Sequence, residues 1–160
     1  MSLDEMLKGE SKNIGYKSGL PKKSERYMKS IIAFANTSGG KLIIGIDDGS
    51  RKVVGVPKDS VFQIMDGFAN AISDCCEPQI IPNITFQTVD GKCIVIVEIY
   101  PGSNRPYFLK NTGKENGTYV RIGGTSRVAD CIKIRELGIE GAGIFGNRRY
   151  VPGKSLQGQR

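Results

Sequence analysis

The sequence predicts a single α+β domain, with a mixed, largely antiparallel sheet that is built from hairpins and packed by about three helices. A chain of 160 residues with 39% hydrophobic content can bury one sizeable core but is short for two. Segments with helix-spaced apolar residues alternate with short apolar runs, some of which meet at Asp-Gly turns. We expect the domain to span residues 1–137, and residues 138–160 to form a basic, glycine-rich tail or linker.

The first half of the chain predicts two helices around a hairpin. Over residues 24–37 apolar residues recur on one helical face, with Ser24 as a candidate N-cap and Gly39–Gly40 as the stop. Two apolar runs, residues 42–46 and 53–56, flank an Asp-Gly turn and indicate a β-hairpin. Residues 59–75 return to helical spacing and predict a second helix.

The second half predicts four more strands and a third helix. Residues 80–89 and 93–100 meet at Asp90–Gly91, and the second run is apolar on both faces, which indicates a central strand. Residues 105–110 and 118–122 predict two short strands. Thr125 or Ser126 is a candidate cap for a third helix, with Val128, Cys131, Ile132 and Arg135 on one side and Gly138 at its end.

Charge is distributed unevenly along the chain, whose net charge is +7. Residues 1–60 carry 11 Lys/Arg against 7 Asp/Glu, residues 61–100 carry 1 against 5, and residues 101–160 carry 11 against 4. The three segments are therefore at +4, −4 and +7, and the two basic ends predict an electropositive face for a polyanionic partner. A basic surface that serves only solubility is the equal alternative.

Several classes of protein are disfavoured by what the sequence lacks. No apolar stretch approaches the roughly 18 residues of a membrane span, and the N-terminus has no signal-peptide core, so we expect a cytoplasmic protein without membrane association. There is no histidine, and the four cysteines lack Cys-x-x-Cys spacing. We therefore expect no metal site, no His-dependent catalysis, and thiols that pack as small hydrophobes. Gly153-Lys154-Ser155 lacks the upstream glycine of a phosphate-binding loop, and we expect no bound cofactor.

One cluster contains the groups that hold a phosphate. Residues 119–127 combine Arg121 and Arg127 with glycine amides, hydroxyls and the start of the predicted third helix. Guanidinium groups donate bidentate hydrogen bonds, and helix N-termini attract anions. Further candidate contacts to a nucleic-acid backbone are basic residues from other segments: Lys17, Lys22, Lys23, Lys41, Arg105 and Lys110. A solvated basic rim is the alternative interpretation.

The most distinctive segment is residues 35–48, which read Ala-Asn-Thr-Ser-Gly-Gly-Lys-Leu-Ile-Ile-Gly-Ile-Asp-Asp. Its two adjacent glycines allow a tight reversal from helix to strand, and the acidic pair Asp47–Asp48 lies at the following turn. An ordinary helix end followed by an Asp-rich turn is the structural alternative.

This segment is part of a longer pattern that runs in order along the chain. The matching residues are Glu10–Ser11, Tyr16–Lys17, residues 33–37 with Gly39–Gly40, residues 44–49, Gly55–Val56, Arg105–Pro106–Tyr107, and residues 119–121 with Gly123. From about Glu10 to about Leu137 the chain resembles the Schlafen-type Alba-like domain of bacterial transcriptional regulators. The resemblance implies a mixed α/β domain that binds DNA. It also implies a following ATPase-like or winged-helix region, so we expect the natural chain to continue.

The same resemblance suggests a nuclease as an alternative. In animal Schlafen relatives the fold can cleave structured RNA with acidic residues, for which Glu10, Asp47 and Asp48 are the candidates here. The family's usual second glutamate is replaced by Gly15, and metal-assisted cleavage needs clustered carboxylates. We therefore expect DNA binding without catalysis, with RNA as the alternative ligand. The other hypotheses are a metal-dependent ribonuclease and a protein-interaction or homo-oligomerisation module.

Overall fold

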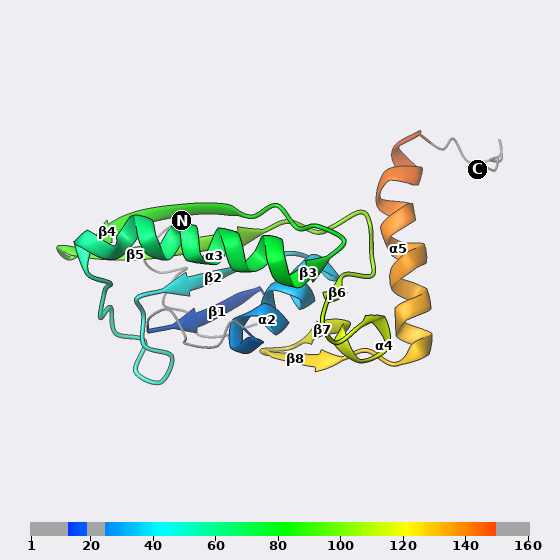
Figure 1. Cartoon of the computed structure of the whole chain (residues 1–160), viewed down its shortest axis with the longest axis horizontal. Helices are drawn as coiled ribbons and strands as arrows, with labels where there is room; N and C mark the ends of the chain where they lie inside the picture. Colours follow the sequence, from blue (N-terminus) through cyan, green and yellow to red (C-terminus); the bar gives the residue numbers. More distant parts are fainter. Residues whose placement is uncertain (1–12, 19–24, 150–160) are drawn as a thin grey trace.

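The computed structural model describes residues 13–18 and 25–149 as an α+β fold (Figure 1). In chain order the elements are β1 (Ile14–Lys17), α2 (Glu25–Ala35), β2 (Gly40–Ile44), the 3-10 helix η1 (Lys58–Ser60), α3 (Val61–Cys75), β3 (Cys76–Glu77), β4 (Asn83–Val89), β5 (Lys92–Ile99), β6 (Phe108–Leu109), α4 (Lys114–Gly117), β7 (Tyr119–Ile122), β8 (Thr125–Val128) and α5 (Cys131–Arg149). The three predicted helices correspond to α2, α3 and α5, and α4 is an extra single turn. The candidate cap Ser24 lies outside the described residues.

The main sheet has four strands in the order β1-β2-β5-β4. Strand β1 runs parallel to β2, with Tyr16 opposite Ile43, whereas the β2–β5 and β4–β5 pairs are antiparallel. The sheet is therefore mixed and largely antiparallel, as the sequence predicts. Residues 93–97 of β5 are all buried, which confirms the expectation of a central strand.

Both faces of the sheet are covered by apolar contacts. Helices α2 and α3 lie on one face, where the rings of Tyr27 and Phe68 meet at a centroid distance of 4.5 Å within the larger core cluster. Burying a side chain such as Phe68 completely contributes roughly 1.5–3 kcal/mol. The other face carries a second cluster, which consists of Tyr16, Ile43, Ile46, Val89, Ile94 and Ile96. Alternation along β2 and β5 thus supplies two cores from the same strands.

The predicted turn at Asp90–Gly91 is confirmed as the tip of the β4–β5 hairpin. Asp90 and Gly91 have φ angles of 51° and 76°, and Val89 pairs with Lys92. Positive φ at both central residues is what a two-residue hairpin loop requires, because it matches the twist of the flanking strands. This turn places β4 at an edge of the sheet.

The predicted hairpin over residues 42–46 and 53–56 is wrong as a regular ladder. Only single bridges form, Ile46 to Val53 and Val56 to Cys93. The carbonyl oxygen of Gly45 accepts hydrogen bonds from the amides of both Val54 and Gly55, each at 2.8 Å. Because both amides bond to this single carbonyl oxygen, residues 53–56 cross the chain at Gly45 and do not run alongside β2. Strand β2 pairs with β5.

The predicted strand over residues 105–110 is shorter than expected. Only Phe108–Leu109 is regular, and it pairs with Cys76–Glu77 of β3, while a single bridge joins Phe108 to Thr118. Pro106 has no amide donor for a ladder, which favours irregular backbone at the start of the predicted run.

The predicted cap at Thr125 or Ser126 is also wrong, because residues 125–128 form β8 and pair with β7. The helix begins later, where Asp130 accepts a hydrogen bond from the amide of Lys133 at 2.8 Å, as an N-cap does. The glycines between the strands favour a hairpin turn, and Gly123 has a φ of 60°.

Helix α5 does not end at Gly138 but continues to Arg149, so the expected boundary after residue 137 falls inside a helix. A Cβ added at Gly141 would lie 2.9 Å from the carbonyl oxygen of Ser103 and 3.1 Å from Cβ of Arg105. The glycines therefore allow the helix to approach the loop before β6. Within the described ranges no helix has both the length and the apolar content to cross a membrane.

The β4–β5 turn gives a test of this fold. Replacing Gly91 with Ala should lower the free energy of unfolding by about 1 kcal/mol, because Ala is strained at positive φ while the site offers open space for its methyl group. Gly49→Ala is the matched control, since Gly49 does not need positive φ. Urea denaturation of both variants measures the difference, and equal effects would contradict the turn geometry.

Candidate functional site

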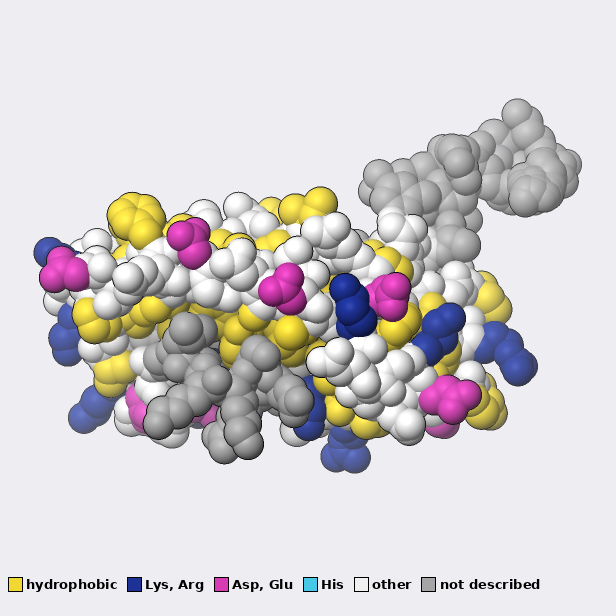
Figure 2. Space-filling view, in the orientation of Figure 1, with side chains coloured by type: hydrophobic (Ala, Val, Ile, Leu, Met, Phe, Trp, Pro, Cys, Tyr) yellow, Lys and Arg dark blue, Asp and Glu magenta, His cyan; other side chains and the backbone are white. Residues whose placement is uncertain are grey.

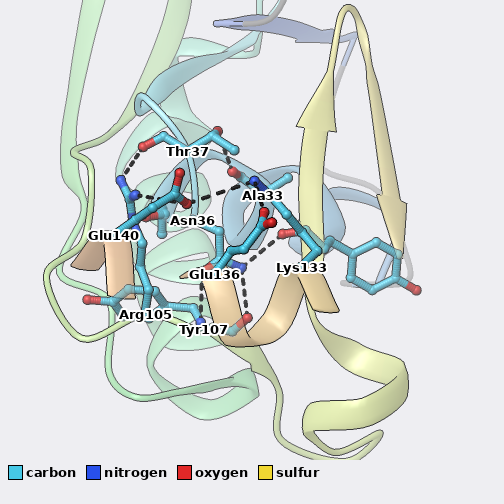
Figure 3. Close-up of polar contacts among 10 residues, drawn as sticks. Ala33, Asn36, Thr37, Arg105, Tyr107, Lys133, Glu136 and Glu140 are labelled. Atoms are coloured by element: carbon cyan, nitrogen blue, oxygen red, sulfur yellow. Dashed lines mark hydrogen bonds and ion pairs between the residues drawn. The ribbon is translucent and has the colours of Figure 1, made fainter. Parts of the chain in front are cut away.

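The side chain of Asn36, directly after α2, joins three parts of the fold (Figure 3). Its Nδ2 donates to the carbonyl oxygens of Tyr107, at 2.9 Å, and Tyr119, at 2.8 Å, and its Oδ1 accepts from the amide of Tyr107 at 2.7 Å. Both amide donors are used, and the residue is only 1% exposed. Asn36 in the distinctive segment is thus a structural link that positions β7 beside α2.

The guanidinium group of Arg105 caps the C-terminal end of α2 (Figure 3). Its Nε donates to the carbonyl oxygen of Ala35 at 3.3 Å, and its Nη2 donates to that of Thr37. The side chain is 7% exposed and lies 4.0 Å from a carboxylate oxygen of Glu140. Burial lowers the pKa of Arg105 while Glu140 acts in the opposite direction, and an arginine stays charged under either influence. Its donors are directed into the protein.

Arg121, the other central arginine of the prediction, is 5% exposed. Its Nη1 donates to Oγ of Ser126 at 3.1 Å, its Nη2 donates to the carbonyl oxygen of Ile14 at 3.3 Å, and its guanidinium carbon lies 5.1 Å from the centroid of the Phe34 ring. These contacts connect the β7–β8 hairpin to β1 and α2. The predicted phosphate contacts of Arg105 and Arg121 stay predictions, and the observed contacts of both are internal.

The glycines of the distinctive segment make the helix-to-strand reversal, as predicted. Gly39 has a φ of 79°, and its amide donates to the carbonyl oxygen of Phe34 at 2.9 Å. A Cβ at Gly40 would lie 2.5 Å from the Phe34 ring and 2.8 Å from the carbonyl oxygen of Asn13. Gly15, where the resemblance leads one to expect a glutamate, is buried opposite Leu42.

The remaining predicted cations differ in their surroundings. Lys41 pairs with Glu98 at 3.7 Å. In the described part of the chain Lys17, Lys110 and Arg127 form no ion pair. Lys17 ends β1, whereas Lys110 follows β6 and Arg127 lies on β8, so the structure does not gather them along one strand. Lys22 and Lys23 lie outside the described residues.

Two exposed lysines beside the β7–β8 hairpin were not among the predicted contacts. Nζ of Lys29 on α2 lies 5.5 Å from the centroid of the Tyr119 ring. The carbonyl oxygen of Lys114 accepts a hydrogen bond from Thr118, directly before β7, at 2.6 Å. Lys29 lies off the apolar face whose spacing predicts α2, so the sequence pattern already indicated that this side chain is exposed. We call the exposed cations on and around this hairpin the basic rim: Lys29, Lys110, Lys114 and Arg127.

Charge is unevenly distributed on the molecular surface. In Figure 2 acidic side chains lie over α3 and Lys and Arg side chains project from the lower side and from both ends, but basic and acidic side chains also lie together near the end of α3. Exposed Asp66 and Asp74 belong to α3, in the segment that the sequence shows to be acidic. Of the basic rim, Lys110 adjoins the end of α3, since its amide donates to the carbonyl oxygen of Cys75 at 2.8 Å, whereas Arg127 lies on β8.

A pocket of about 540 Å³ lies between residues 36–38, the β7–β8 hairpin and the start of α5. Its charged lining comprises Arg105, Arg121 and Lys133 together with Asp130 and Glu140. Glu140 lies 4.0 Å from Arg105 and 3.8 Å from Lys133, so two of the three cations already have a carboxylate beside them (Figure 3). The volume suits a small ligand, but the balanced charges favour neither an anion nor a cation.

The candidate nuclease residues are not assembled in the described structure. Oδ2 of Asp47 accepts hydrogen bonds from the amide and from Oγ of Ser50, at 2.8 and 2.9 Å. These bonds lower the pKa of Asp47, the backbone amide contributing most. Asp48 is exposed, and Glu10 lies outside the described residues. Among the residues that the structure describes, no three His, Cys, Asp or Glu side chains are grouped to hold a metal ion.

The cysteines form no disulfide. Cys76 and Cys93 are buried in the larger core, in agreement with the prediction that thiols pack as small hydrophobes. Burial raises the pKa of the Cys76 thiol to about 12, so the group stays protonated and unreactive. Cys131 is exposed at the start of α5 and departs from that prediction.

The Asn36 link predicts a large loss of stability on truncation. Asn36→Ala should lower the free energy of unfolding by about 3 kcal/mol, because two carbonyl groups and one amide are left buried without their partner. Ser38→Ala, at an exposed position two residues on, should change it by less than about 0.5 kcal/mol. Chemical denaturation followed by circular dichroism gives both values, and a loss at Asn36 as small as that at Ser38 would refute the assigned role.

Comparison with known proteins places this geometry in a family. The structure is similar to the N-terminal domain of a RecG-related protein from Nitrosomonas europaea, with a TM-score of 0.57, 24% identity, and coverage of 78% of this chain and 88% of that one. It is also similar to the DIP2311 protein from Corynebacterium diphtheriae, with a TM-score of 0.59, 18% identity, and coverage of 79% of this chain but 23% of that one. These similarities concern the fold. The family model described as Schlafen, AlbA_2 matches residues 10–130, and the chain therefore belongs to the Schlafen AlbA_2 family.

Proposed function

We propose that this domain binds nucleic acid through the basic rim, as the DNA-contacting part of a cytoplasmic bacterial transcriptional regulator. The observation that carries the proposal is the set of exposed cations around the β7–β8 hairpin, none of which is in an ion pair within the described residues. The name of the Nitrosomonas europaea relative connects that protein with DNA helicases, which agrees with a nucleic-acid partner.

The rim cations form no ion pair within the described residues, and this matters for phosphate binding. A cation already paired with a carboxylate, such as Lys41 with Glu98, must lose that partner before it can contact a phosphate. Lys29, Lys110 and Arg127 require no such exchange, and each phosphate contact releases condensed counterions, which favours association. Lysine and arginine contacts to phosphates carry no sequence information by themselves. The rim is thus expected to supply affinity with little base recognition.

The buried arginines support this surface from within. Arg121 holds the hairpin against α2 and β1, and Arg105 closes the end of α2 from which Asn36 reaches β7. A hairpin backbone that is fixed in this way need not be ordered when Arg127 meets a phosphate, which reduces the entropic cost of binding. Any sequence-specific recognition would belong to another region of the regulator, for which the family resemblance suggests an ATPase-like or winged-helix segment.

A salt titration tests the rim. The logarithm of the association constant for duplex DNA should fall linearly with the logarithm of salt concentration, and Lys29→Glu with Arg127→Glu should make the slope shallower by about 2, since roughly 0.9 is lost per phosphate contact. The matched control is Lys52→Glu with Lys58→Glu. That pair changes the charge equally and lies in the segment between β2 and α3, which Figure 1 shows to the left of β8.

Fluorescence anisotropy with labelled duplex DNA, single-stranded DNA and structured RNA measures these slopes and ranks the ligands. An unchanged slope in the rim variant would contradict the proposal, and so would an equal change in the control, because net charge alone would then account for binding.

We propose further that the domain binds without cleaving. Gly15 supplies no carboxylate, and Asp47 already accepts two hydrogen bonds from Ser50 at the loop tip. Phosphodiester cleavage with a divalent cation requires several oxygen ligands directed at one ion. Among the candidate acidic residues that the structure describes, Asp47 and Asp48 provide too few such ligands for that chemistry.

Structured RNA incubated with the protein and magnesium or manganese should therefore remain intact. Gel electrophoresis of end-labelled RNA makes the measurement, with Asp47→Asn and Asp48→Asn proteins prepared in parallel to expose a contaminating nuclease. Cleavage that depends on the metal and disappears in either aspartate variant would overturn the proposal and establish the ribonuclease alternative.

A further inference from the structure

Strand β4 forms an outer edge of the main sheet, and no strand of the described residues pairs with its outer side. The strand has seven residues, of which Asn83, Thr85, Phe86 and Thr88 are exposed. An edge strand presents unpaired backbone groups, and proteins usually protect such an edge with charges, proline or a bulge. Residues 83–89 contain no charged residue and no proline, and their pairing with β5 is continuous. The β4 edge therefore has none of these protections.

Exposed apolar side chains lie along the same edge. Phe86 is 48% exposed, and its ring meets that of Phe62 on α3, itself 67% exposed, edge-on at a centroid distance of 5.8 Å. Ile81, two residues before β4, is 81% exposed. Figure 2 shows hydrophobic side chains projecting along the upper side of the molecule, over α3 and β4. Aromatic pairs exposed on a regular edge are typical of interaction surfaces.

We propose that β4 pairs antiparallel with β4 of a second copy of this chain, which joins the two main sheets into one. A two-fold axis through the middle of the seven-residue strand passes beside Phe86, so that each Phe86 lies opposite its counterpart. The two Phe62–Phe86 pairs then form one four-ring cluster on the α3 side. The contact is self-complementary because the same residues supply both halves.

The charges around β4 favour a second copy as the partner. Residues 78–89 are uncharged, so two-fold pairing brings no like charges together along the strand. In this antiparallel arrangement the charged turn at Asp90 of one copy lies beside the uncharged start of β4 in the other. A basic or acidic partner strand would find no counter-charge here. In Figure 1 β4 and β8 lie on opposite sides of the molecule, so the dimer keeps both basic rims exposed.

Sedimentation velocity of the full chain without nucleic acid tests the proposal separately from the proposed function. The protein should form a dimer and nothing larger as its concentration rises towards about 1 mM. Phe86→Lys should raise the dimer dissociation constant by about tenfold or more. Ile132→Lys, at a position that is 63% exposed on α5, should leave the dissociation constant unchanged. A monomer throughout, open-ended assembly, or a Phe86→Lys protein that folds and dimerises normally would overturn the proposal.

A cross-link decides the matter if Phe86→Lys does not fold. Cα atoms directly opposite in an antiparallel pair are about 4.5–5.5 Å apart, a separation that a disulfide can span. Phe86→Cys in a Cys131→Ser background should therefore form a covalent dimer under mild oxidation, whereas Ile132→Cys in the same background should not. Non-reducing electrophoresis measures the covalent dimer of both variants. A Phe86→Cys protein that stays monomeric, or cross-links no better than the Ile132→Cys control, would overturn the proposal.

Discussion

The three hydrogen bonds of the Asn36 side chain position the strands that lie outside the main sheet. Strands β6, β7 and β8 do not belong to the main sheet, and the backbone ladders of that sheet cannot position them. The Asn36 amide replaces such a ladder with bonds to Tyr107 and Tyr119, from the end of a helix whose other side is packed into the core. In a dry environment an amide with every partner in place specifies one arrangement strongly. The hairpin that carries Arg127 is positioned by this arrangement.

Two central arginines and two lysines of this domain differ in burial and in the contacts that they make. Arg105 and Arg121 are buried and direct planar donor groups at carbonyl oxygens, a hydroxyl and an aromatic ring. Lys29 and Lys110 are exposed and carry compact ammonium charges. This division follows from chemistry, since a guanidinium group has five donors in fixed directions whereas an ammonium group is strongly hydrated. A high net positive charge therefore does not translate directly into a count of phosphate contacts.

Sequence reasoning located the helices and three strands of the main sheet, β2, β4 and β5, because their signals are local, but it missed β1. The apolar spacing of residues 24–37 and the Asp90–Gly91 turn each describe an element without reference to distant residues. It failed where a distant partner decides the outcome. Residues 53–56 have strand propensity, but the hydrogen bonds from Val54 and Gly55 to the carbonyl oxygen of Gly45 determine their path. Residues 125–128 form a strand because they pair with β7. The burial of Arg121 depends on Phe34 and Ile14, far away in sequence, and no local pattern could have predicted it.

The close approach of α5 to the loop before β6 fixes the direction in which the chain leaves the domain. Gly141 lies against Ser103 and Arg105, and Glu140 adds an ion pair to the same loop, so the middle of α5 is attached to the body and its later turns extend the same axis. A continuous helix transmits orientation as well as distance. The part of α5 that follows Gly141 therefore takes its direction and its rotational setting from these contacts. Inserting or deleting one residue after Gly141 would turn the helical residues that follow, up to Arg149, by about 100° around the axis.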